Sequence, residues 1–105
     1  KYSTNFIPMG AKVKQLFDTE GNHGAWIHEC PGCGYGHAFD NRWTFNGDLE
    51  KPTFSPSMLV NKDRQKDADG TPSIRCHYYL RDGKIQFLND SDHDLKGKTV
   101  ECPDY

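Results

Sequence analysis

Short runs of alternating apolar and polar residues make up much of the chain, and this two-residue period predicts β-strands. The expected strands cover residues 11–18, 25–30, 37–40, 42–48, 53–60 and 98–102. No window keeps an apolar period of 3.6 residues, so little helix is expected. Pro56 confines its strand to a sheet edge or a bulge, because proline donates no backbone hydrogen bond. The pattern predicts one small, mostly β antiparallel domain over residues 1–105.

The clearest unit is a hairpin in "CHYYLRDGKIQFL", residues 76–88. Asp82-Gly83 between two alternating runs is the signature of a two-residue hairpin turn. That turn sets a register with these pairs on one face: Leu80–Ile85, Tyr78–Phe87 and Cys76–Asn89. Side chains alternate along a strand, so Cys76 should point toward the core and His77 away from it.

Composition indicates a thin core. Only 34% of the 105 residues are apolar and the mean hydropathy is −0.88, although 13 aromatic residues partly compensate. Trp43, Phe45 and Phe54 are therefore expected in the core rather than on a surface that stacks bases. The net charge of −2 does not favour nucleic acid, and no apolar run approaches the length of a membrane span. A domain of this kind often needs a staple.

The stretch "HECPGCGYGH", residues 28–37, offers such a staple. No secretory signal is seen at the N-terminus, and in a reducing compartment paired cysteines more often bind metal or do redox work than form disulfides. A redox pair needs its first cysteine at a helix N-terminus, and the glycines around Cys33 disfavour that helix. A zinc knuckle at Cys30 and Cys33 is favoured, with a glycine turn carrying inert thiols as the alternative.

Zinc takes four ligands, so two more must come from elsewhere in the chain. Cys76 is the expected third ligand. The fourth is left open between His37, four residues after Cys33, and His77, beside Cys76 on the hairpin strand. Less favoured candidates are His28, His93 and Cys102.

The segment "NDSDHD", residues 89–94, alternates carboxylates around His93. It lacks the glycine and glutamate of a calcium loop, so an acidic, solvated turn is the favoured interpretation. The alternative hypothesis combines His93, His77 and an aspartate in an open metal or acid–base site. The sequence contains no G-x-S-x-G, P-loop, H-E-x-x-H or dinucleotide motif.

Four blocks carry a family resemblance: "CPGCGYGHAF", "WTFNGDLEKPTFSPSML", "RCHYYLRDGKIQFLNDSDHDL" and "GKTVECPDY". Together they resemble a family of small phage and prophage proteins of unknown function. The chain is also distantly similar to the domain of unknown function 6527 group, in which a cysteine-rich knuckle precedes a Cys-His hairpin. The resemblance implies phage origin and a zinc site, and it favours His77 over His37 as the fourth ligand.

From these features we expect a non-catalytic, zinc-stapled phage accessory protein in the bacterial host cytoplasm. It would bind a host or phage macromolecule. The expected partner is a protein, and a component of host defence is one hypothesis for it. The alternatives are a small zinc-dependent hydrolase, in which the metal keeps an open position, and a structural component of the virion. Four protein ligands on the metal would indicate the non-catalytic protein, and three ligands with an open position would indicate the hydrolase.

Overall fold

The regular structure of the protein consists of β-strands. The computed structural model describes residues 3–4, 10–17, 19–66, 68, 70 and 73–105, and over these residues no helix occurs, so none is long and apolar enough to cross a membrane. The strands are β1 (Ser3–Thr4), β2 (Lys14–Phe17), β3 (His23–Cys30), β4 (Tyr35–Phe39), β5 (Thr44–Phe45), β6 (Phe54–Val60), β7 (Cys76–Arg81), β8 (Lys84–Phe87) and β9 (Thr99–Glu101). This content confirms the expected mostly β fold.

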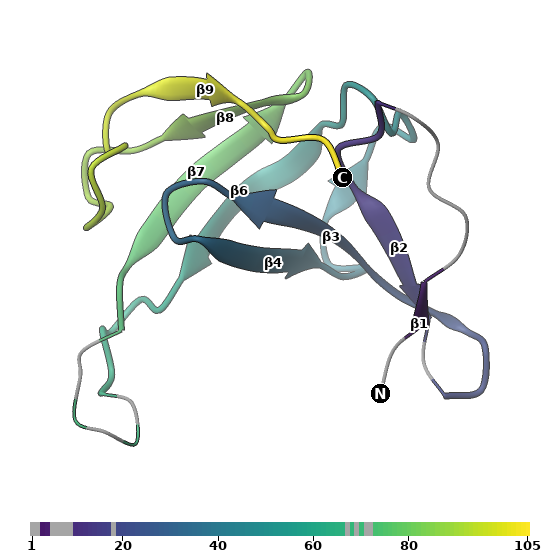
Figure 1. Ribbon diagram of the computed structural model, residues 1–105, viewed down its shortest axis with the longest axis horizontal. Coiled ribbons are helices and arrows are strands. Elements are labelled where there is room, and N and C mark those ends of the chain that lie inside the picture. The colour runs from purple at the N-terminus through teal and green to yellow at the C-terminus, as the bar shows by residue number, and fades with distance from the viewer. Residues whose placement is uncertain (1–2, 5–9, 18, 67, 69, 71–72) are drawn as a thin grey trace.

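Two antiparallel sheets divide the strands (Figure 1). One has the order β1-β2-β3-β4 and the other β5-β6-β7-β8-β9, so within each sheet every strand pairs with its neighbours in sequence. β3 begins at His23, two residues earlier than the expected strand 25–30. Asp18, at the end of the expected 11–18 strand, lies outside the described residues.

The β7–β8 hairpin confirms the sequence prediction. Its ladder pairs Tyr78 with Phe87 and Leu80 with Ile85. Asp82 and Gly83 have φ angles of 52° and 75°, the left-handed values that a type I′ turn requires. The alternation places Cys76 in the core with 0% exposure, while the side chain of His77 keeps 24% exposure on the other face.

β6 is irregular at its centre. Phe54 pairs with Leu80 and Met58 with Tyr78, so four residue steps on β6 oppose two on β7. The interruption contains Pro56, which has no N–H for the ladder. A bulge of this kind bends a strand and redirects its side chains, and bulges are common next to active sites.

Aromatic side chains form the core between the two sheets. Phe39 of the first sheet stacks on Phe54 of the second with ring centroids 4.1 Å apart, and Phe45 stacks on Phe54 at 4.5 Å. Trp43 and Phe45 are partly buried against this cluster, as the composition predicted. The sheets also meet through a buried hydrogen bond of 2.6 Å between His28 Nε2 and the Tyr78 hydroxyl.

Three segments of the chain lie at one side of the molecule. The β3–β4 turn, the start of β7 and the β8–β9 connection all lie at the left in Figure 1. The first belongs to one sheet and the other two to the second sheet. This side carries the residues described next.

Candidate functional site

Three cysteines and a histidine converge at that side. The ligand atoms of Cys30, Cys33, Cys76 and His93 all lie within 4.8 Å of one another. Cys30 Sγ is 3.9 Å from Cys76 Sγ, and Cys76 Sγ is 3.3 Å from His93 Nε2. A zinc tetrahedron with ordinary bond lengths has sulfur–sulfur edges of about 3.8 Å and sulfur–nitrogen edges of about 3.5 Å. The donor set and its spacing therefore fit a tetrahedral metal ion, and the four cysteines form no disulfide.

The cluster joins the two sheets. Cys30 ends β3 and Cys33 follows in a tight turn, closed by a hydrogen bond of 2.8 Å from Gly34 N to Cys30 O. Cys76 begins β7, and His93 comes from the β8–β9 connection. Gly32 lies so close to the His93 ring that a Cβ at this position would overlap the ring. A metal ion here would connect segments that are distant in sequence.

The electrostatics of the cluster favour a cation. The hydrogen bond from Cys76 lowers the pKa of the Cys30 thiol, and the same bond, followed by burial, raises the pKa of Cys76. Burial also raises the pKa of Cys33 to about 11. Three sulfurs in so small a volume cannot all ionise unless a positive charge compensates them, and a divalent ion provides that charge.

The structure places the expected fourth ligands elsewhere. His77 points to the opposite face of β7 from Cys76, because adjacent residues of a strand alternate. His37 is buried, with its ring 5.8 Å from that of Tyr78, and its Nε2 has no hydrogen-bond partner among the described residues. His93, a less favoured candidate in the sequence, is the histidine that the structure groups with the three cysteines. Cys102 is buried apart from the cluster, with Sγ 3.9 Å from His28 Nδ1.

His77 belongs to a second constellation on the outer face. Its Nε2 lies 3.2 Å from Ser57 Oγ, and its Nδ1 lies 3.2 and 3.1 Å from the two carboxylate oxygens of Asp90. If Nδ1–H donates to Asp90, the unprotonated Nε2 accepts from the serine hydroxyl. A serine, a histidine and an aspartate in this order have the geometry of a nucleophile, a general base and an orienting carboxylate.

The β6 irregularity positions the serine. Leu59 is the direct partner of His77 in the ladder, so Ser57, two residues earlier, is its diagonal neighbour on the same face. The Trp43 indole N–H donates to the carbonyl oxygen of Ser57 at 3.3 Å, which holds the backbone at the bulge. Ser57 is only partly buried, unlike the core residues Phe54 and Met58 of the same strand.

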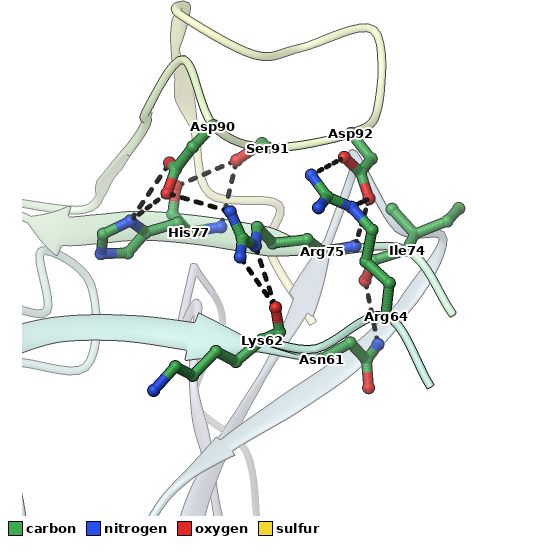
Figure 2. A network of polar contacts seen from close by, with 9 residues as sticks. All are labelled: Asn61, Lys62, Arg64, Ile74, Arg75, His77, Asp90, Ser91 and Asp92. Atoms are coloured by element: carbon green, nitrogen blue, oxygen red, sulfur yellow. Dashed lines mark hydrogen bonds and ion pairs between the residues drawn. The ribbon is translucent and has the colours of Figure 1, made fainter. Parts of the chain in front are cut away.

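Residues 89–94, which we call the acid segment, carry the aspartate (Figure 2). The Ser91 hydroxyl accepts a hydrogen bond from His77 N at 3.0 Å and donates one to His77 O at 3.1 Å. One residue further on, the Asp92 carboxylate accepts from Arg75 N at 2.8 Å. The guanidinium of Arg75 lies 3.9 Å from Asp90 Oδ2. The acid segment is thus hydrogen-bonded along the start of β7, with its carboxylate directed at the imidazole.

Ser57, His77 and Asp90 form a candidate catalytic triad. Sequence reasoning considered the histidine and an aspartate of this triad, but it combined them differently. The alternative site grouped His93, His77 and an aspartate, whereas the structure divides them between the metal cluster and the triad. Ser57 carried no local signal, since it follows a proline in a strand and lacks glycine neighbours. Only the Pro56 bulge marked its position as unusual.

A family model with the description "Bacterial ubiquitination-like system serine protease (BubE)" matches residues 4–88 of the 105-residue chain. The chain belongs to this family. The matched range contains Ser57, His77 and the three cysteines of the cluster, and it ends two residues before Asp90. Neither the search of curated proteins nor the search of solved structures found a match.

This membership corrects the functional expectation. The prediction of a non-catalytic binding module is wrong, because the family is described as one of serine proteases. The same family description also contradicts the zinc-hydrolase and virion alternatives. The sequence reasoning failed because it sought catalysis in short motifs, whereas the candidate triad is assembled from two strands and a loop. Phage origin and a protein partner stay predictions.

Proposed function

We propose that this chain is a serine protease with Ser57 as nucleophile, His77 as general base and Asp90 as the orienting carboxylate. The observation that carries the proposal is the hydrogen-bonded series from Ser57 Oγ through the imidazole to the Asp90 carboxylate. Family membership supports it independently, since the nucleophile that the description requires is a serine. The description also supports a polypeptide of a bacterial ubiquitination-like system as the substrate.

The chemistry follows from the positions of the three side chains. Ser57 Oγ bonds to the carbonyl carbon of the scissile peptide while its proton passes to His77 Nε2. The C–N bond then breaks, and the departing amine takes that proton, which leaves an acyl-serine ester. Water attacks the ester with the imidazole again as base, so the acid product is released and Ser57 regains its proton. Asp90 holds the ring in the required tautomer and stabilises its charged form throughout.

We further propose that the metal at the cysteine cluster is zinc in a structural role. Three thiolates and one imidazole form a donor set typical of closed zinc sites, in which protein ligands take all four positions. A tetrahedron filled in this way holds no water for metal-assisted hydrolysis. Zinc would connect the two sheets and add folding energy to a thin core.

The test of the catalytic assignment is labelling with a fluorophosphonate probe, followed by mass spectrometry of the adduct. In this reaction Ser57 Oγ bonds to phosphorus, fluoride leaves and the serine proton passes to His77. We expect the metal-loaded protein to be labelled at Ser57, and Ser57→Ala to lose labelling. Ser55→Ala is the matched control, because Ser55 is an exposed serine on the same strand without the contact to the imidazole. Labelling that persists in Ser57→Ala would refute the assignment.

A further inference from the structure

The metal cluster and the triad share two short segments of chain. On β7, the ligand Cys76 directly precedes the base His77. On the acid segment, the ligand His93 lies three residues after Asp90. We propose, on the basis of the function proposed above, that a metal bound at this cluster sets the aspartate against the imidazole. Occupancy of the cluster would thereby control the reactivity of the serine without the metal touching a reacting atom.

Only two residues of the acid segment are buried. Ser91 is 3% exposed and His93 is 8% exposed, whereas the other four residues of the segment are exposed. Ser91 connects the segment to the backbone of His77 on one side of Asp92. His93 fixes the other side, with its ring against Phe87 at 4.5 Å and against Gly32. These two anchors restrict where Asp90, which lies between β8 and His93 in the chain, can be placed.

The metal adds what the other contacts of this segment do not provide. The ion pair between Arg64 and Asp92 is exposed to solvent, and exposed pairs restrict a loop only weakly. Between Cys76 Sγ and His93 Nε2 a thiol can offer only a weak hydrogen bond. Coordination would replace this contact by directional bonds from one ion to β7, to the acid segment and to the β3–β4 turn.

Catalysis is sensitive to this restriction. Catalytic groups need to be held to within about 0.5 Å, and a displacement of about 1 Å can cost on the order of 100-fold in rate. An acid segment released from the cluster keeps its hydrogen bonds at Ser91 and those between Asp92 and the Arg75 backbone, but it gains freedom at His93. We therefore expect about a 100-fold slower fluorophosphonate labelling of Ser57 when the metal is removed.

The experiment compares metal-loaded protein, chelator-treated protein and chelator-treated protein given zinc again. Elemental analysis gives the metal content, and circular dichroism tests whether the fold is retained. Two readouts are taken from each sample: the labelling rate at Ser57, and the far-downfield proton resonance of the His77 Nδ1–H bonded to Asp90. We expect removal of the metal to slow labelling about 100-fold and to abolish the resonance, and we expect zinc to restore both.

Two variants and one control variant keep the test decisive if metal removal unfolds the chain. His93→Cys preserves a four-ligand site but shortens the side chain, so the bound metal draws the acid segment inward. We expect it to retain metal and to lose labelling and the resonance. Cys33→Ala removes a ligand on the β3–β4 turn, away from the acid segment in sequence. Its control, Cys102→Ala, removes a more deeply buried cysteine that lies outside the cluster. Only the former should affect both readouts.

Each result supports or overturns the coupling. A folded, metal-free protein that keeps the labelling rate and the resonance would overturn it, as would a His93→Cys protein with unchanged labelling. If the metal-loaded protein is never labelled at Ser57 but its resonance depends on metal, the proposed function fails and the positional coupling stands. If the protein is labelled equally well with and without metal, the coupling fails and the proposed function stands.

Discussion

Replacing Gly32 by alanine should disrupt the metal cluster while leaving all four ligands in place. A Cβ on Gly32 would lie 2.5 Å from His93 Nδ1 and closer still to two other ring atoms, whereas ordinary contacts are 3.4–4 Å. The imidazole must therefore move by about 1 Å, and metal–ligand distances tolerate only about 0.2 Å. We expect metal affinity to fall at least about tenfold, which corresponds to about 1.4 kcal/mol.

Competition with a chromophoric chelator measures this affinity. Gly36→Ala is the matched control, since its Cβ would meet the flexible end of Ile27 and a carboxylate of Glu29 rather than a ligand. It lies in the same part of the chain and should bind metal as the parent protein does. If Gly32→Ala retains the parent affinity, the His93 ring is not held against the β3–β4 turn, and the four-ligand geometry is refuted.

Three further predictions concern the triad and the core. Asp90→Asn should slow fluorophosphonate labelling by a factor on the order of 10⁴, because an amide favours the wrong tautomer, and Asp94→Asn on the same segment should not. Equal rates for the two variants would exclude Asp90 from the triad. Tyr78→Phe should lower the free energy of unfolding by about 1–3 kcal/mol in denaturant titrations, since it leaves the buried His28 Nε2 without its partner. Phe54→Ala should lower it by about 3–5 kcal/mol, because two stacked rings lose their neighbour; a loss below 1 kcal/mol would contradict this packing.

Burial explains why His28 contributes to the core rather than to chemistry. Its ring is shielded between the sheets, and this burial lowers the pKa of His28 to about 4. A neutral imidazole can exchange hydrogen bonds with the Tyr78 hydroxyl and the Glu29 carbonyl without the cost of a buried charge. The sequence could not separate this histidine from the metal candidates, because its spacing from Cys30 is equally compatible with a ligand.

Much of the fold could be predicted because its signals are local. Alternation located every strand except β1, although β2 and β5 are shorter than expected. Asp82-Gly83 set the register of the β7–β8 hairpin, since a two-residue turn determines which residues face each other. The same alternation placed Cys76 and His77 on opposite faces. Applied consistently, that observation already argued against both residues binding one ion.

The candidate site could be predicted only in part. The pair Cys30 and Cys33 is a local motif, and the thin core favoured a metal to staple it. The choice of His93 depends on how the β8–β9 connection folds back toward the β3–β4 turn, and no spacing in the sequence encodes that contact. The candidate nucleophile was missed because nothing beside Ser57 in the chain marks it as reactive.

The sequence by itself determined most of the strand content, the hairpin register and a cysteine pair suited to metal, because each depends on residues a few positions apart. Tertiary structure alone decided which histidine joins the cysteines and which meets a serine. Those contacts are made between segments 17 to 63 residues apart, across a sheet or between two sheets. Their geometry depends on packing of the whole chain, so a single local pattern could not specify them.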